Sequence, residues 1–537
     1  MDNQTQYQPV VGKSLIEILM FSMYSNSLII YREYVQNAFD AIVEAARKGV
    51  LNSVKDGHVS ITIDPHDRLI RIKDNGIGIR VSEAQKTLLN IADSHKDGIA
   101  LAGQYGIGRL VGAKYCKRLV FKTSAKGEDR YTEVIFDNEL AHKIIQNKED
   151  ESTATQVIER ITRTIVGDAD VDDHYFEVKM EDVALTHSGL LNDEKVSEYL
   201  REVAPIDFQM EFKNQLYNQC LPVVFKELND DMNHIKLSVN NEIDIRKRYG
   251  LSIDGTGDKI SSLEFFKIED SKFGLLGWGW YAITPFSKNI PASDVNRGIR
   301  LRKRNIQIGA KDLLNQYFQE ARGNNYFYGE IHATHPNLRP NSSRDGLTHT
   351  AEAIKLYDYI REYFADLKKL YHLANEMKNL TRDIQVVGSK APQTQEEKSD
   401  VQKKLEASVS KIEKIKEKFK DHDTLGAASD KVISIYSDDI DKTLDSLPTD
   451  IVHGIQVQPE TPREQAPQKT PTPPVTVEEQ LAAPVIKDMF APLSRKFSPE
   501  QVKLIRQVFV ALTQNFPLSQ RAMFEAIKEK TIKQLSK

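Results

Sequence analysis

The chain has 537 residues, with 73 basic and 77 acidic side chains, a formal net charge of −4 and an apolar content of 40%. This length suits about three to four domains, and the balance of charge excludes a protein that coats nucleic acid or an anionic membrane over its whole surface. With cysteine only at Cys116 and Cys220, a disulfide framework and a cysteine-based zinc cluster are excluded as well. Residues 1–11 lack the apolar block of a secretion signal, and no run approaches the ~20 apolar residues of a membrane span, so we expect a cytoplasmic protein.

Residues 1–188 have the pattern of an α/β layer domain. Apolar residues recur at helical spacing from Ser14 to Arg47, which predicts one long helix. Two strands are predicted at 58–64 and 69–73, joined by residues typical of a turn. Residues 189–349 contain further strand-like runs at 235–239, 278–284 and 299–308, separated by helical stretches. They predict a second α/β domain.

The region 350–445 is predicted to be a helical arm. Apolar residues from Thr350 to Arg382 share one helical face, and a near-heptad pattern follows from Val401 to Phe419. The second pattern fits a helical hairpin or a short coiled coil, and an arm packed on its own domain is the alternative.

The C-terminal part of the chain is predicted to be a linker followed by a small module. Seven of the 20 prolines lie between Pro459 and Pro484, so residues 446–485 should form an extended linker. Residues 486–537 predict a basic helical module, because ten basic and four acidic residues lie between Lys487 and Lys537. This module could bind a separate acidic partner, or its charges could form a solvated helical face.

Three short stretches in the first domain carry candidate chemistry, beginning with an acidic helix. Glu33, Asn37 and Asp40 stand one turn apart on one face of the predicted helix. A carboxylate can polarise a water, and an amide oxygen can help to complete the oxygen shell of Mg²⁺. Taken alone, such a triplet is more often a solvated helix face.

The second stretch follows the predicted strand 69–73 and contains Asp74, Gly76 and Gly78. A carboxylate at a strand end can accept a hydrogen bond from an exocyclic amine, and the glycines let the backbone approach a flat base. A plain turn is the alternative.

The third stretch is a glycine-rich run at 103–108. It consists of Gly103, Gln104, Tyr105, Gly106, Ile107 and Gly108. Its glycines allow backbone N–H groups to converge on a phosphate, and the helix expected after it would point its positive end the same way.

In this order and spacing, the three stretches resemble the Bergerat ATP-binding fold of the GHKL ATPases, the superfamily of gyrase B, the ninety-kilodalton heat-shock chaperone, histidine kinases and MutL. Most of the matching residues lie between Ser14 and Phe121. The resemblance is closest to the heat-shock chaperone, whose ATP domain has sequences similar to residues 23–26 and 103–108. It implies a Bergerat-type α/β sandwich, a ribosomal-S5-like α/β second domain, and hydrolysis of ATP with Mg²⁺.

The resemblance gives each matched residue of the acidic helix and of the Asp74 stretch a role. Glu33 would be the base that orients the attacking water, Asn37 would hold Mg²⁺, and Asp40 would lie in the same nucleotide site. Asp74 would accept a hydrogen bond from the adenine amine, and Gly76 and Gly78 would leave room for the base.

The glycine-rich run 103–108 would wrap the triphosphate, and residues 91–101 would form the ATP lid. Within that lid Lys96 would contact phosphate, with an exposed lysine as the alternative. The Gly-Thr pair of the family has its best match in Ala154-Thr155 before a predicted strand, which makes Thr155 a candidate nucleotide contact.

Two features of the second domain concern arginines. Residues 338–345 resemble the chaperone loop that sends an arginine to the γ-phosphate, so Arg344 would neutralise transition-state charge. An ion pair of Arg344 with Asp345 or a glutamate is the alternative. Arg300, Arg302 and Arg304 would share one face of the predicted strand 299–308, where they could meet phosphates or a partner's acids, or form a solvated face.

The resemblance implies a clamp, in which closure of the lid over ATP brings the ATP domains of two protomers together as a homodimer. A chaperone-like machine acting on a protein client is the first hypothesis. A nucleic-acid clamp of the MutL or MORC type, in defence against foreign DNA, is the second, and a nucleotide-gated scaffold without turnover is a third.

Overall fold

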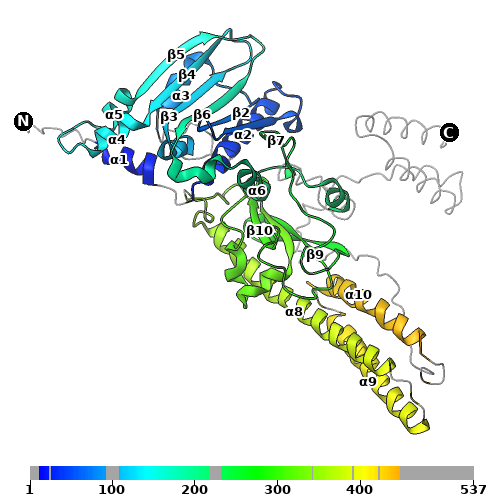
Figure 1. The fold of residues 1–537 in the computed structure, drawn as a ribbon. Coiled ribbons are helices and arrows are strands. Elements are labelled where there is room, and N and C mark those ends of the chain that lie inside the picture. The colour runs from blue at the N-terminus through cyan, green and yellow to red at the C-terminus, as the bar shows by residue number, and fades with distance from the viewer. Residues whose placement is uncertain are drawn as a thin grey trace, which may run out of the picture. The chain divides into compact units, whose positions relative to one another are not determined.

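The computed structural model describes residues 11–22, 26–91, 108–216, 232–341, 343–389, 392, 394–420, 422, 424–447 and 451 (Figure 1). The predicted tail module, and the predicted linker apart from residues 446, 447 and 451, lie outside the described residues. The described chain has a mixed α/β architecture followed by helices, as the sequence predicts.

Seven strands form the first sheet, in the order β5-β4-β3-β6-β2-β1-β7. They are β1 His58–Asp64, β2 Leu69–Asp74, β3 Cys116–Ser124, β4 Arg130–Asp137, β5 Thr162–Asp168, β6 Tyr175–Val183 and β7 Lys236–Val239. Buried side chains alternate with more exposed ones along β1, β2 and β4, as expected for a sheet covered on one face.

The β1–β2 hairpin confirms the two strands predicted for this segment. The strands pair antiparallel from Val59 opposite Asp74 to Asp64 opposite Leu69. On its other side β2 pairs with β6, and this register sets Asp74 opposite Phe176. Asp74 therefore ends a central strand, with a neighbouring strand on each side.

The helical segments of this layer are α1 Ser14–Glu17, η1 Ile18–Ser22, α2 Ile29–Arg47, η2 Val54–Asp56, α3 Val81–Leu89, η3 Gly108–Tyr115, α4 Asn138–Gln146, α5 Ala154–Ile161, η4 Leu185–Leu191 and α6 Asp193–Val203. Apolar side chains of α2, such as Ile30 and Ile42, share one buried core with Ile61 and Ile72 of the hairpin. This packing fixes α2 beside the sheet.

The single helix predicted from Ser14 to Arg47 is wrong. Residues 18–22 form a π-helical turn, residues 26–28 are not helical, and α2 begins at Ile29. Asn26 Oδ1 accepts a hydrogen bond from Leu28 N at 3.0 Å. This local bond competes with continuous helix, as asparagine side chains commonly do.

The first core extends past residue 188, where the sequence places the end of the first domain. Strand β7 pairs in parallel with β1, from Lys236 opposite His58 to Val239 opposite Ile61. Leu200 of α6 and Leu237 of β7 are fully buried in the same core as α2. The strand predicted at 235–239 therefore belongs to the first sheet.

Five strands form the second sheet, in the order β11-β10-β12-β9-β8. They are β8 Ser262–Asp270, β9 Gly274–Ile283, β10 Gly298–Lys303, β11 Ile306–Gln307 and β12 Tyr328–Ala333, with η6 Leu313–Tyr317 and η7 Ala321–Tyr326 between them. The one strand predicted at 299–308 is two, because the chain turns at Arg304 and Asn305, whose φ angles are 50° and 63°.

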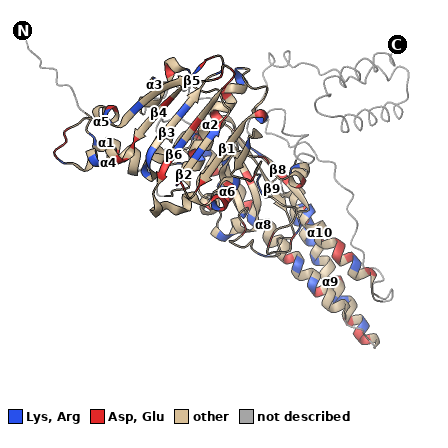
Figure 2. Cartoon of the chain, turned by 45° about the horizontal axis from the view of Figure 1, so that its top comes forward, with Lys and Arg blue, Asp and Glu red and all other residues tan. Residues whose placement is uncertain are grey.

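Three helices follow: α8 Ala351–Gly388, α9 Gln395–Phe419 and α10 Gly426–Asp445. The near-heptad residues Val401, Leu405, Ile412 and Phe419 are buried in the core that α8 and α10 share with the second sheet. The arm is thus packed on its own chain, and blue and red residues mix along its helices in Figure 2. In the part of the chain that the structure describes, no helix is long and apolar enough to cross a membrane.

Candidate functional site

The acidic helix α2 buries its charged residues instead of exposing them. Glu33 is 2% exposed and Asp40 is 1% exposed, while Asn37 between them is partly exposed. A solvated helix face is therefore the wrong interpretation of this triplet. Buried carboxylates carry a desolvation cost, so they need partners, and each has one from the second domain.

The Asp74 loop packs directly on α2. Gly76 N donates to Asp74 Oδ1 at 2.8 Å, and Ile77 N donates to the carbonyl of Ala41 at 3.1 Å. A Cβ on Gly76 would lie 2.6 Å from Ala41 Cβ, so the close approach requires glycine. Burial raises the pKa of Asp74 to about 7, although hydrogen bonds from backbone N–H groups oppose the shift.

Gly78 is needed for a reason that the sequence does not show. Its φ is +65°, and a Cβ here would lie 1.8 Å from the carbonyl oxygen of Ser124 at the end of β3. The space that glycine leaves is therefore filled by this chain's own backbone, and the role of making room for an adenine stays a prediction.

Gly108, the last residue of the glycine-rich run, lies against Glu33. A Cβ on Gly108 would come within 3.0 Å of Glu33 Oε2. Tyr34 holds the segment that follows: its hydroxyl donates to Arg109 O and accepts from Gly112 N, both at 3.0 Å. Lys96, Gly103, Gln104, Tyr105, Gly106 and Ile107 lie outside the described residues.

Arg344 from the second domain reaches the same carboxylate. Its Nε lies 3.3 Å from Glu33 Oε1, and its Nη2 lies 3.5 Å from Oε2. Arg344 is 8% exposed and has a φ of +61°. The side chain of Asp345 instead accepts a hydrogen bond from Asn341 Nδ2 at 2.6 Å. Of the two expectations for Arg344, an ion pair with a glutamate is present, and that glutamate is the predicted base.

Further buried donors line a small cavity beside this ion pair. Arg32 Nε, Arg32 Nη2 and Gln36 Nε2 are buried and make no hydrogen bond within the described part of the chain. Charged and amide side chains from both domains line the cavity, namely Arg32, Gln36, Lys303, Gln307 and Arg344. Unsatisfied buried donors of this kind suit an anionic group or an ordered water.

Thr155 does not lie at the start of a strand, because residues 154–161 form helix α5. Thr153 and Gln156 form a capping box, with Gln156 N donating to Thr153 Oγ1 at 3.2 Å and Thr153 N to Gln156 Oε1 at 2.9 Å. Thr155 is exposed on this helix. The Thr-x-x-Gln spacing is the signal that could have predicted the helix start.

Two side chains that the sequence analysis did not assign support the Asp74 loop. Thr123 Oγ1 accepts from Ile79 N and donates to the carbonyl of Tyr175, both at 2.9 Å. His174 Nδ1 lies 2.9 Å from the carbonyl oxygen of Gly76. Both contacts come from the sheet, since Thr123 lies on β3 and His174 directly precedes β6, which starts at Tyr175.

Arg300 and Arg302 of β10 are buried, so they do not form the solvated face that was one of the expected alternatives. Arg300 is 3% exposed and Arg302 is 1% exposed. Arg300 pairs with Glu202 at 3.1 Å, and Arg302 pairs with Glu330 at 2.6 Å. The acids that these arginines meet belong to the same chain, so the two arginines are not available to bind nucleic acid.

One known protein family matches the part of the chain in which the converging segments lie. Residues 25–166 match the family described as "Histidine kinase-, DNA gyrase B-, and HSP90-like ATPase". The matched span contains α2, the Asp74 loop and the glycine-rich run.

Curated relatives include bacterial proteins named "Chaperone protein HtpG". The chain is 24% identical over 254 residues to that of Fusobacterium nucleatum subsp. nucleatum, which is 43% of this chain and 41% of the relative. It is 28% identical over 205 residues to that of Natranaerobius thermophilus, 35% of this chain and 32% of the relative.

A longer alignment joins the chain to the HtpG of Clostridium acetobutylicum. It is 21% identical over 397 residues, which is 65% of this chain and 56% of the relative. The chain therefore spans less than two thirds of the length of each of these three relatives. Over residues 25–166, this chain carries a domain of the histidine kinase-, DNA gyrase B- and HSP90-like ATPase family, in the GHKL superfamily.

Proposed function

We propose that this chain binds ATP between α2, the Asp74 loop and the glycine-rich run, and hydrolyses it slowly. The observation that supports this most is the meeting of three distant segments around Glu33. Gly108 lies against its carboxylate, the Asp74 loop packs on its helix, and Arg344 pairs with it. A solvated acidic helix or a plain turn would not require this convergence.

In this proposal Asp74 recognises the base. Its carboxylate ends β2, is 5% exposed, and is held in place by the N–H of Gly76. An ionised carboxylate at this position can accept a hydrogen bond from the exocyclic amine of adenine. Thr123 and His174 keep the loop in position from β3 and from the start of β6.

Glu33 would act as the general base for the attacking water, and Arg344 would stabilise the charge that develops on the transferred phosphoryl group. In the structure Glu33 pairs with Arg344, and Arg32 Nη2 also lies 3.7 Å from Glu33 Oε1. Arg344 must leave Glu33 before it can reach a phosphate and before Glu33 can take a proton. This requirement is a physical reason to expect slow turnover.

Magnesium fits the donors of α2 only in part. Asn37 offers an amide oxygen on the partly exposed side of the helix. Among the described residues, no three His, Cys, Asp or Glu side chains gather where they could hold a metal ion by themselves. Mg²⁺ would therefore need phosphate oxygens besides Asn37, and it would supply charge neutralisation at those phosphates.

We further propose that the nucleotide state opens and closes a homodimeric clamp in the cytoplasm, with chaperone-like action on a protein client. The similarity to relatives named as chaperones supports the chaperone-like part of this proposal. The MutL- or MORC-type clamp is the weaker alternative, because Arg300 and Arg302 are buried against acids of this chain.

ATP-dependent phosphate release by the purified chain tests the proposal. We expect slow release that requires Mg²⁺, and absence of any ATP binding would contradict the proposal. Retention on DNA with a non-hydrolysable ATP analogue separates the two clamps. Salt-sensitive retention would favour the nucleic-acid clamp, and no retention at low salt would exclude it.

A further inference from the structure

The turn between β10 and β11 has an unusual backbone for its residues. Arg304 and Asn305 form a two-residue loop between the pair Lys303–Ile306, and their φ angles are 50° and 63°. Loops of this kind usually hold glycine or asparagine, and arginine in the left-handed region is uncommon. Such a conformation persists where the surroundings enforce it.

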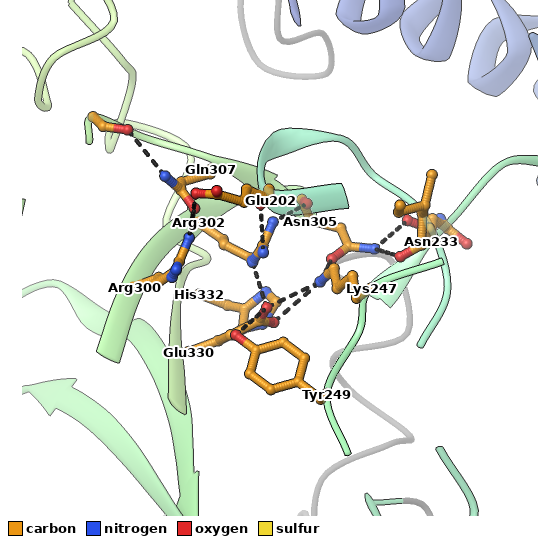
Figure 3. A network of polar contacts seen from close by, with 12 residues as sticks. Glu202, Asn233, Lys247, Tyr249, Arg300, Arg302, Asn305, Gln307, Glu330 and His332 are labelled. Carbon is orange, nitrogen blue, oxygen red and sulfur yellow. Dashed lines mark hydrogen bonds and ion pairs between the residues drawn. The ribbon is translucent and has the colours of Figure 1, made fainter. Parts of the chain in front are cut away.

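A buried network enforces this turn (Figure 3). Asn305 Oδ1 accepts from Lys247 Nζ at 2.6 Å, and Arg302 Nη1 donates to Asn305 O at 3.0 Å. Lys247 and Arg302 both bind Glu330, at 3.1 Å and 2.6 Å, and all three side chains are at most 1% exposed. Burial alone would raise the pKa of Glu330, but the charges of Arg302 and Lys247 outweigh it and hold the pKa well below its ordinary value.

The same network ties the turn to the end of α6, to the segment that follows it and to the segment before β7. Arg302 Nη2 donates to Glu202 O at 2.9 Å, and Asn305 Nδ2 lies 3.3 Å from Ile206 O and 3.2 Å from Asn233 O. Ile206 is fully buried in the first core. The turn is therefore fixed to the part of the chain that also positions α2.

From this fixed turn the Arg304 side chain extends to α2. Arg304 Nη1 lies 3.7 Å from Asp40 Oδ1, seven residues beyond Glu33 on the helix. Gly309, two residues after β11, makes a second link, because its N–H donates to the carbonyl of Arg344 at 2.8 Å. One hairpin thus carries Arg304 to Asp40 and holds the backbone of Arg344, whose side chain pairs with Glu33.

We propose that Arg304 is a positioning residue, which docks the second domain on α2 through Asp40 and so sets the approach of Arg344 to Glu33. This inference rests on the proposed ATPase function for its kinetic consequence. Its structural consequence does not depend on ATP, because the Arg304–Asp40 ion pair joins two parts of the protein itself. Replacing a residue that only stabilises the fold would change hydrogen exchange in both domains. Replacing a docking residue would change hydrogen exchange in the Arg344 loop alone.

The test compares full-length Arg304→Met, Arg304→Lys and Arg322→Met proteins. Arg322 is an exposed arginine of the second domain that pairs with Glu320, so it controls for loss of a surface charge. Steady-state phosphate release should show a kcat about 10-fold lower in Arg304→Met, with the KM for ATP within about 2-fold, because transition-state stabilisation alone is lost. Arg304→Lys should recover most of the rate, and Arg322→Met should match the wild type.

Hydrogen–deuterium exchange without nucleotide gives a reading that does not require ATP hydrolysis. We expect faster exchange at residues 343–347 in Arg304→Met, with unchanged exchange across β3 and β6. Unchanged exchange and kcat in Arg304→Met would overturn the proposal, as would an equal loss of ATP affinity. If wild-type protein did not hydrolyse ATP, altered exchange confined to the Arg344 loop would still support the docking role.

Discussion

Arg344 Nε lies 3.3 Å from Glu33 Oε1, although 311 residues separate the two in the chain. The pair joins the second domain to the helix of the ATPase-family domain, and it is almost fully removed from solvent. A buried ion pair of this kind costs desolvation of both charges, so it is weak support for stability as such. Its position suggests that the contact matters for what Glu33 and Arg344 do.

Replacement of this arginine, Arg344→Ala, should slow ATP hydrolysis by about 100-fold or more, since a charge-neutralising arginine contributes strongly to phosphoryl transfer. ATP affinity should change by less than about 3-fold, because in this proposal Arg344 meets the phosphate in the transition state. Phosphate release and calorimetry measure the two quantities. A matching loss of affinity would show that Arg344 acts in ground-state binding.

Asp74→Asn should abolish measurable ATP binding, because the amide presents an N–H group where the adenine amine needs an acceptor. The substitution keeps the size of the side chain, and its oxygen can still accept from Gly76 N. Asp168→Asn on the exposed end of β5 is a matched control. Fluorescence titration with a labelled ATP analogue measures the nucleotide affinity of both variants. Wild-type affinity in Asp74→Asn would show that Asp74 does not recognise the base.

Asp74 should also make the stability of the ligand-free protein depend on pH. Burial raises its pKa from 3.8 to about 7, so the folded state binds this proton more tightly than the unfolded state. The contribution of Asp74 to the free energy of unfolding is therefore full below pH 3.8 and is lost as pH rises through about 7. The difference between wild type and Asp74→Asn should change by up to about 1.4 kcal/mol per pH unit in this window. Melting temperatures that differ by a constant amount across the window would contradict the prediction.

The two glycines Gly78 and Gly127 should respond differently to alanine. Both have positive φ, +65° and +87°, but only a Cβ on Gly78 would collide with backbone, at 1.8 Å from Ser124 O, whereas nothing lies within 4 Å of one on Gly127. Gly127→Ala should cost about 1 kcal/mol of backbone strain, and Gly78→Ala should cost several times more. Thermal unfolding of both variants checks the order, and equal effects would mean that the loop after β2 moves freely.

The sequence predicts those parts of the fold that depend on local pattern. Residue patterns predict the β1–β2 hairpin, and helical spacing predicts α8 as far as Arg382. The Thr350 cap, whose side chain accepts from Ala353 N at 3.2 Å, is a finding of the structure. The resemblance also assigns Glu33, Asp74 and Gly108 to one nucleotide site, and in the structure their segments lie close together.

Parts that depend on distant partners could not be predicted in this way. The spacing of Arg300 and Arg302 shows that they share a face, but burial of that face depends on Glu202 and Glu330. The difference at Thr155 has another cause, because the local capping signal of Thr153 and Gln156 starts a helix where the family pair predicts a strand. The pairing of Arg304 with Asp40 has no sequence signal at all, since it arises from the way the two domains meet.

If Glu33 is the base of a nucleotide site, Glu33→Ala should separate the binding of ATP from its hydrolysis. Calorimetry and phosphate release on the same sample of full-length protein should show ATP bound with an affinity within about 3-fold of wild type and hydrolysis reduced by at least about 100-fold. Unchanged hydrolysis in Glu33→Ala would show that Glu33 is not the base.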